Sequence, residues 1–201
     1  VAAIKNTGAE VRFVDIGRDF LINVKKIKHS ISSKTKAIIP VHLFGQTCDM
    51  NEILLISKKY NLKIIEDCAQ ACGALYKGRK AGTMGDIGCY SFYPTKILGA
   101  YGDGGFLTTN NKRLYEKMHR FRFYGIDTLK KKKKWNNAYY SIDHGTNSRL
   151  NEIQASILNL KLKHVNSYIR KRRFIAQKYF IGLKESGITV PIVNKKNFHV
   201  F

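Results

Sequence analysis

Short apolar runs alternate with stretches of helical periodicity along most of this chain. The expected strands are residues 11–16, 36–43, 62–67, 87–93 and 105–109, and the expected helices are residues 19–31, 49–60, 111–123, 149–162 and 166–185. Thr47 and Asp49 are candidate caps of the second helix and Asn61 is its candidate stop, and Asn110 and Asn111 are candidate caps of the third. Strands and helices in this order predict an α/β domain of three layers, built around a mostly parallel sheet.

The rhythm breaks between residues 124 and 143, where five lysines, Lys130–Lys134, follow one another. A block of like charge is usually a solvated loop. The helices after it lead away from the sheet, so we expect a large domain over residues 1–160. Residues 161–201 are then a connecting helix and the start of a small C-terminal domain. Because the chain starts at Val1 without an initiator Met and stops within a strand-like run, we expect a fragment that lacks both ends.

Two candidate catalytic side chains stand just past the ends of apolar runs. Asp67 ends the run that starts at Leu62, and Lys96 follows the run over residues 87–93. Ligands of α/β sheets bind at the carboxyl ends of strands, so both side chains are expected near one site. A lysine amine that loses its proton can form a Schiff base with a carbonyl group. The ordinary alternatives are a solvated lysine and a carboxylate that caps a loop.

Phosphate binding is the second chemistry that this stretch suggests. Ser91 stands five residues before Lys96, and its hydroxyl is able to donate a hydrogen bond to a phosphate. Four glycines between Gly99 and Gly105 permit close approach of the backbone to a ligand. They match neither a Walker loop nor the GxGxxG pattern, so a nucleotide-binding fold is weakly supported. A buried serine that bonds its neighbours is the alternative for Ser91.

Composition raises the question of nucleic-acid, membrane and metal binding. The 201 residues hold 36 Lys and Arg against 14 Asp and Glu, a net charge of +22, which would suit a nucleic-acid partner. The basic residues are spread over the whole chain without a reading motif, so we expect no nucleic-acid partner. No apolar run approaches the roughly 18 residues that cross a bilayer, so no membrane partner is expected. Cys68 and Cys72 lack a matching second pair of ligands, and we expect no metal site.

The central stretch resembles a known enzyme family. The segments IIPVHLFGQTCDM (38–50), IIEDCAQACGA (64–74), GDIGCYSFYPTK (85–96), GDGG (102–105) and HGTNSRLNEIQASIL (144–158) match its patterns in order. The family is that of the DegT/DnrJ/EryC1/StrS sugar aminotransferases, which use pyridoxal 5′-phosphate (PLP). The resemblance covers essentially the whole chain. It implies fold type I of the PLP enzymes: a large domain with a seven-stranded, mainly parallel sheet and a smaller C-terminal domain.

The resemblance also assigns roles to five residues. Lys96 corresponds to the lysine that carries PLP and then shuttles a proton. Asp67 is expected to pair with the pyridinium nitrogen, and Gln70 to lie against the ring near its hydroxyl. Ser91 is expected to bind the cofactor phosphate. Asn147 is expected to reach that phosphate from the neighbouring subunit of a homodimer.

The implied reaction moves an amino group from glutamate to a keto sugar on a nucleoside diphosphate, in the cytoplasm, for cell-surface polysaccharide synthesis. Residues 139–150 further resemble enzymes that aminate the 3-keto position of a dTDP-6-deoxyhexose. The lysine loop precedes Asn147, so we hypothesise that Lys131–Lys134 contact the diphosphate. The family's relative with dehydratase activity has histidine in place of the lysine, and Lys96 therefore favours transamination. A catalytically silent family member with a regulatory or binding role is the alternative.

Overall fold

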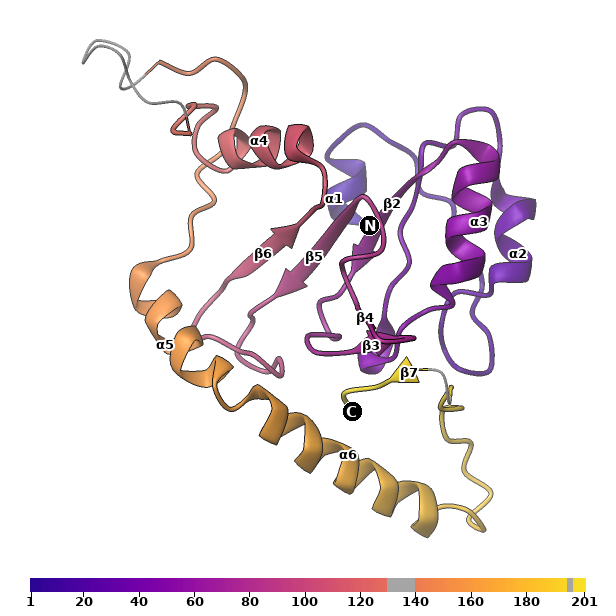
Figure 1. Ribbon diagram of the computed structural model, residues 1–201. Coiled ribbons are helices and arrows are strands. Elements are labelled where there is room, and N and C mark those ends of the chain that lie inside the picture. The colour runs from indigo at the N-terminus through magenta and orange to yellow at the C-terminus, as the bar shows by residue number, and fades with distance from the viewer. Residues whose placement is uncertain (130–139, 195–196) are drawn as a thin grey trace.

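The main sheet contains four strands and is mostly parallel. The computed structural model describes residues 1–129, 140–194 and 197–201. In these residues the sheet has the order β1-β2-β5-β6, formed by β1 (Ala37–Ile38), β2 (Lys63–Asp67), β5 (Ile87–Ser91) and β6 (Gly105–Thr108). The first three strands run parallel, and β6 is antiparallel to β5 (Figure 1). The predicted α/β architecture with a mainly parallel sheet is therefore present.

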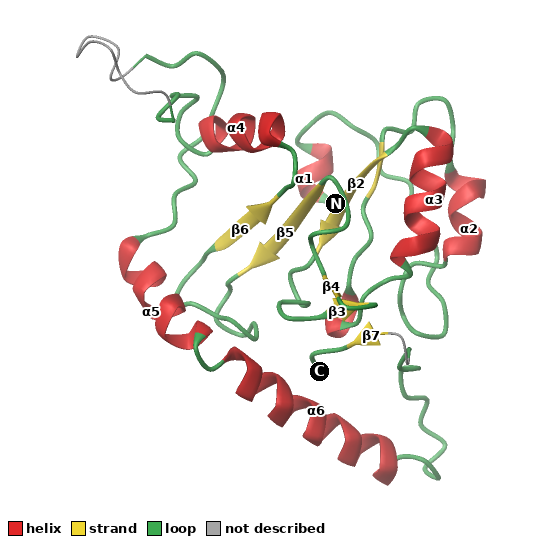
Figure 2. Ribbon diagram, in the orientation of Figure 1, coloured by secondary structure: helices red, strands yellow, loops and turns green. Residues whose placement is uncertain are grey.

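Helices precede and follow the strands of this sheet along the chain. They are α1 (Ala2–Lys5), α2 (Val24–Ser30), the 3-10 turn η1 (Leu43–Gly45), α3 (Met50–Tyr60), α4 (Lys112–Phe121), α5 (Glu152–Leu162) and α6 (Val165–Gly182). Helix α3 lies next to β2 and α2 packs beside α3, whereas α5 and α6 run one after the other along the outside of the molecule (Figure 2). In the part of the chain that the structure describes, every helix is too short or too polar to span a membrane.

The caps of α3 show why a sequence reading locates this helix well. Asp49 precedes the helix, and its side chain accepts a hydrogen bond from the backbone N–H of Glu52. Asn61 ends it in the left-handed conformation, with φ of 50°. Both residues satisfy backbone groups that a helix leaves unpaired at its ends. The predicted bounds of this helix are confirmed.

A second, smaller sheet has the order β4-β3-β7 and was not predicted. It contains β3 (Leu75–Tyr76), β4 (Arg79–Lys80) and β7 (Asn197–Phe198), all antiparallel. Lys77 and Gly78 connect β3 to β4 with φ of 48° and 80°. Positive φ at both central residues is the requirement of the tightest hairpin turn. The chain thus returns after α6 to add β7 beside a hairpin from its first half (Figure 1).

Two apolar clusters form the core. The first lies among β1, β2, α2 and α3 and includes Ile27, Ile53 and Ile64. The second surrounds the segment after β2, and residues beyond position 160 contribute to it: Val165, Ile169 and Val200. Residues 161–201 are therefore packed against residues from the first part of the chain. The division into domains at residue 160 stays a prediction.

Three predicted elements differ from the structure. Residues 11–16 form no strand, and only Ile16 makes an isolated bridge, to Ile22. The helix predicted for residues 19–31 begins at Val24, because Phe20 has φ of 61° and the side chain of Asn23 caps the later start. The strand predicted for residues 36–43 is reduced to β1, since Pro40 has no N–H to donate and the 3-10 turn η1 already begins at Leu43.

Candidate active site

The carboxyl ends of β2 and β5 bring Asp67 and Ser91 to the same edge of the sheet. The two strands are parallel neighbours, and Asp67 is in register with Cys89, two residues before Ser91. Both side chains are partly buried. This edge of a parallel sheet is where α/β proteins usually bind ligands, so polar side chains here are candidates for ligand contacts.

Hydrogen bonds of its backbone and side chain hold Asp67 in place. Its N–H donates to the carbonyl of Pro40 (2.9 Å), and its carbonyl accepts from the N–H of His42 (3.0 Å). The carboxylate oxygen Oδ1 accepts a hydrogen bond of 3.0 Å from the N–H of Ala69. The structure shows no partner for the other oxygen, Oδ2, among the described residues. One carboxylate oxygen is thus oriented by the loop, and the other is available to a ligand.

Lys96 lies in a tight loop that follows β5. Its backbone N–H donates to the carbonyl of Tyr93 (2.9 Å), and the N–H of Ala100 returns to the carbonyl of Phe92 (2.8 Å). The chain can close in this way because Gly99 lies against the carbonyl of Pro94. A Cβ at position 99 would stand only 2.4 Å from that oxygen. The loop therefore fixes the backbone from which the Lys96 side chain extends.

A pocket of about 230 Å³ contains Lys96 in its wall. The described residues that line it are Phe44, Gln70, Thr95, Lys96, Ile97, Arg172, Val200 and Phe201. Gln70 enters the wall with its amide oriented, since Oε1 accepts a hydrogen bond of 2.6 Å from the N–H of Phe44. This bond leaves the two N–H donors of the Gln70 amide for other partners. The structure thus brings together Lys96 and Gln70, 26 residues apart in sequence.

The other three predicted residues, Asp67, Ser91 and Asn147, do not line this pocket. The Ser91 hydroxyl accepts a hydrogen bond of 3.2 Å from the N–H of Tyr93, at the start of the lysine loop. Asn147 is exposed, forms a bridge with Phe123, and accepts a hydrogen bond of 3.0 Å at Oδ1 from Arg149 Nε. The lysines expected to contact a diphosphate, Lys131–Lys134, lie outside the described residues.

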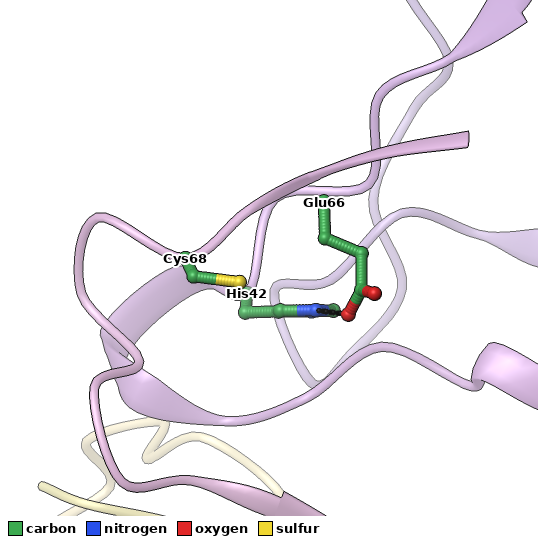
Figure 3. Close-up of side chains that lie close together, drawn as sticks. All are labelled: His42, Glu66 and Cys68. Atoms are coloured by element: carbon green, nitrogen blue, oxygen red, sulfur yellow. Dashed lines mark hydrogen bonds and ion pairs between the residues drawn. The ribbon is translucent and has the colours of Figure 1, made fainter. Parts of the chain in front are cut away.

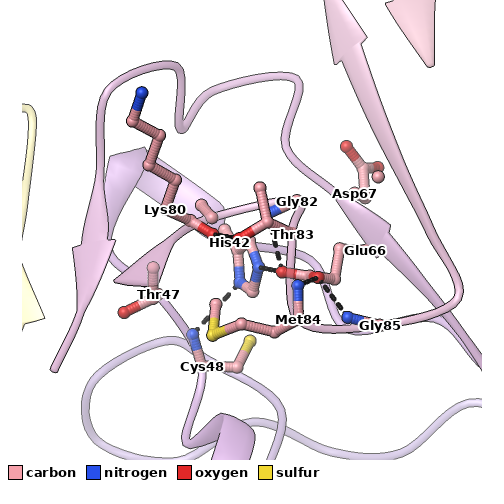
Figure 4. Close-up of polar contacts among 12 residues, drawn as sticks. His42, Thr47, Cys48, Glu66, Asp67, Lys80, Gly82, Thr83, Met84 and Gly85 are labelled. Atoms are coloured by element: carbon pink, nitrogen blue, oxygen red, sulfur yellow. Dashed lines mark hydrogen bonds and ion pairs between the residues drawn. The ribbon is translucent and has the colours of Figure 1, made fainter. Parts of the chain in front are cut away.

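Sequence reasoning missed a buried pair beside Asp67, formed by His42 and Glu66. Glu66 Oε2 stands 3.0 Å from His42 Nε2, and both side chains are completely buried (Figure 3). The same carboxylate accepts backbone hydrogen bonds from Gly82 (2.7 Å), Met84 (2.7 Å) and Gly85 (2.6 Å) (Figure 4). Burial alone raises the pKa of Glu66, but the hydrogen bonds from His42, Gly85 and Gly82 outweigh burial and hold that pKa below its ordinary value.

The pair and Cys68 also deserve consideration as metal ligands. Ligand atoms of His42, Glu66 and Cys68 all lie within 4.8 Å of one another. However, His42 Nδ1 accepts a hydrogen bond of 3.1 Å from the N–H of Cys48, so the ring proton is on Nε2 and is donated to Glu66. Burial raises the pKa of the Cys68 thiol, with further contributions from the charges of Glu66 and Asp67. His42 and Glu66 therefore form a hydrogen-bonded support beneath the strand end, with the Cys68 thiol beside it.

A signal for this support was present in the sequence. Side chains alternate between the two faces of a strand, so Glu66 and Asp67 must point in opposite directions. If Asp67 faces a ligand, Glu66 has to enter the interior, where a carboxylate needs several donors. His42, in the apolar run of residues 36–43, was a visible candidate for one of them.

Comparison with known proteins identifies the family to which this chain belongs. The family model of the DegT/DnrJ/EryC1/StrS aminotransferase family matches residues 1–201. The chain belongs to this family. The resemblance read from the motifs is thereby confirmed, and so is the predicted α/β fold class.

Individual members of the DegT/DnrJ/EryC1/StrS family agree with this assignment. A dTDP-3-amino-3,4,6-trideoxy-alpha-D-glucose transaminase from Micromonospora megalomicea subsp. nigra is 42% identical over 206 residues, covering 100% of this chain and 53% of the relative. The solved structure of a family aminotransferase from Brucella abortus has a TM-score of 0.90 at 34% identity, covering 99% of this chain and 53% of that one. The chain spans about half the length of these relatives.

One further solved structure bears on the cofactor. The NtdA structure from Bacillus subtilis, with bound cofactor PMP, has a TM-score of 0.84 at 34% identity. The alignment covers 99% of this chain and 44% of that one.

Proposed function

We propose that the protein containing this chain is a PLP-dependent aminotransferase that moves an amino group from glutamate to a keto sugar on a nucleoside diphosphate. The observation that carries the proposal is the pocket lined by Lys96 and Gln70, which follow the strand ends at Ser91 and Asp67 by five and three residues. Membership of the aminotransferase family supports the same reaction class.

The chemistry of the donor set fits PLP. The Lys96 amine suits the aldehyde of this cofactor, and the Asp67 carboxylate suits its pyridine nitrogen. The Gln70 amide suits the ring hydroxyl, and the Ser91 hydroxyl suits the phosphate. When bound, PLP serves as an electron sink for the bond broken at the amino-bearing carbon of the substrate. The relative with bound PMP supports a cofactor of this type.

Each of these residues then has a defined task. Lys96 Nζ would hold the cofactor's aldehyde carbon and, once released, would carry a proton between the substrate carbon that bears the amine and that aldehyde carbon. Asp67 Oδ2 would keep the proton on the pyridine nitrogen, because Oδ1 is already oriented by Ala69. Ser91 would donate its hydroxyl proton to the phosphate, since its oxygen already accepts from Tyr93. Gln70 would donate from its free amide N–H groups.

The substrate and setting belong to the same proposal. A 3-keto dTDP-deoxyhexose is the sugar nucleotide that the name of the Micromonospora relative supports. We further propose a cytoplasmic homodimer, with Asn147 reaching the partner's site, a large domain over residues 1–160 and a product used in cell-surface polysaccharide. The exposure of Asn147, away from the pocket of its own chain, supports a role at a neighbouring subunit.

An absorbance titration with PLP tests the proposal. The full-length gene product should gain a near-visible band on addition of PLP, and borohydride should fix the cofactor covalently. Lys96→Ala should lose both, while Lys77→Ala, which changes an exposed lysine in the β3–β4 turn, should retain both. Addition of glutamate should then bleach the band. The absence of any Lys96-dependent band would overturn the proposal in favour of a catalytically silent family member.

A further inference from the structure

We propose that Arg172 binds a carboxylate of the amino donor at the wall of the pocket that contains Lys96. This inference rests on the proposed function and adds the position of one substrate. Arg172 is an exposed residue of α6, 76 positions after Lys96, yet both line the same pocket of about 230 Å³. The long helix α6, which carries Arg172, runs along the outside of the molecule (Figure 1).

The charge of the pocket wall points to an anionic ligand. Among the described residues that line it, Lys96 and Arg172 are cationic and none is acidic. Throughout residues 1–129, 140–194 and 197–201, the structure shows no hydrogen bond, ion pair or ring contact for the Arg172 guanidinium. An arginine with five N–H donors on a ligand-sized pocket is therefore available for an external oxyanion.

Arg172 differs in this respect from its neighbours on the same helix. Arg170 and Arg173 are three residues apart, share one helix face and line a separate pocket of about 680 Å³. Arg173 is already engaged there, because its guanidinium lies 4.0 Å from the ring centre of Phe198. The arginines at positions 170, 172 and 173 of α6 thus separate into two groups, and among these three only Arg172 lines the pocket that contains Lys96.

A carboxylate suits this position better than the diphosphate of a sugar nucleotide. The planar guanidinium matches a carboxylate with two parallel hydrogen bonds. In a sugar nucleotide the diphosphate is separated from the keto carbon by atoms of the sugar ring. In an α-amino acid the carboxylate is bonded to the carbon that bears the amine. An arginine that holds this carboxylate therefore keeps the reacting carbon near Lys96.

Equilibrium binding of glutarate, a dicarboxylate without an amino group, tests this inference on the PLP-loaded full-length gene product. Arg172→Gln should raise the Kd for glutarate by about 10- to 100-fold, the usual effect of losing a charge-assisted hydrogen bond. Arg172→Lys should recover part of the loss. Arg170→Gln is the matched control. It removes the same charge from a residue that lines a different pocket, two positions before Arg172, and it should leave glutarate binding unchanged. Calorimetry measures all four proteins, and circular dichroism checks that each is folded.

The outcomes separate this inference from the proposed function. If Arg172→Gln weakens binding of dTDP and not of glutarate, Arg172 serves the diphosphate and the carboxylate assignment is overturned. Equal glutarate binding by wild type and Arg172→Gln, or no binding by wild type, overturns it as well. The Lys96-dependent absorbance band is measured on the same samples. A normal band together with an unchanged glutarate Kd rejects only the role of Arg172, whereas a missing band rejects the aminotransferase proposal itself.

Discussion

His42 Nε2 donates a 3.0 Å hydrogen bond to Glu66 Oε2, between two side chains that are completely buried. The backbone N–H of the same histidine donates to the carbonyl of Asp67. One residue thus supports both members of the acid pair, Glu66 through its side chain and Asp67 through its backbone. The proposed cofactor carboxylate therefore depends on a network that never touches the ligand.

Replacing Glu66 by Gln should destabilise the protein strongly. The amide keeps only one acceptor oxygen, and its NH₂ group would face backbone N–H donors of the 82–85 loop. Breaking a buried charged network of this kind costs about 3 kcal/mol or more of unfolding free energy. Urea denaturation measures the loss. Glu185→Gln changes an exposed carboxylate and should cost less than about 0.5 kcal/mol. Similar losses in the two variants would contradict the structural role of Glu66.

The same carboxylate should make stability depend on acid pH. The pKa of Glu66 is lowered by folding, so its contribution is fully present above its unfolded value, near 4.5. As the pH falls from that value through the lower folded pKa, the contribution is lost. The difference in unfolding free energy between wild type and Glu66→Gln should therefore shrink as the pH is lowered from 6 to 3. A difference that stays constant over this range would exclude the predicted linkage, and the difference for Glu185→Gln should stay flat.

Gly82 should tolerate a side chain far less than Gly78. Both residues have φ near 80°, but a Cβ at Gly82 would lie 2.3 Å from the Tyr90 hydroxyl oxygen, whereas nothing stands within 4 Å at Gly78. Gly78→Ala should cost about 1 kcal/mol from the backbone alone. Gly82→Ala should cost roughly 2 kcal/mol more, from the clash with a packed ring. Thermal unfolding of the two variants measures the difference, and equal losses would show that the Tyr90 side chain moves aside freely.

Asp49 and Tyr76 should be energetically coupled. The Tyr76 hydroxyl donates a 2.6 Å hydrogen bond to Asp49 Oδ1, the oxygen that also caps α3. Tyr76 is buried, and burial, with a further contribution from Asp49, raises its pKa to about 12. Asp49→Ala should lower the free energy of unfolding by about 2 kcal/mol, because it removes the cap of α3 and the acceptor of the Tyr76 hydroxyl. Tyr76→Phe should cost less, and the double variant should cost less than the sum. Strict additivity in urea denaturation would contradict the coupling.

The sequence predicted elements whose boundaries are local and missed those that depend on distant partners. The helix α3 carries its own caps in Asp49 and Asn61, so it was located correctly. Residues 11–16 have strand-like alternation, but a strand exists only where another strand pairs with it, and here only Ile16 is bridged. The Lys77-Gly78 turn was a local signal that we overlooked.

The residues of the candidate site also differ in how far the sequence predicted them. Lys96 and Asp67 were visible because each follows an apolar run, and Gln70 and Ser91 because of the family motifs. Arg172 was not, since no local pattern relates a helix residue to a loop 76 positions earlier. Strand alternation indicates that Glu66 is buried, but it does not identify His42, 24 positions earlier, as the partner. The role of Asn147 stays a prediction, because it concerns a second subunit.

Mixed dimers provide a direct test of Asn147. Lys96→Ala and Asn147→Ala should each abolish or strongly reduce the half-reaction with glutamate when expressed alone. In a dimer of the two full-length variants, one site would combine Lys96 of one subunit with Asn147 of the other and be complete. Random pairing makes half of the dimers mixed, each with one complete site of two, so co-expression should restore about a quarter of wild-type activity. If Asn147 acts within its own subunit, every site in the mixed dimer lacks one group and no activity returns. Stopped-flow absorbance with glutamate distinguishes the two arrangements.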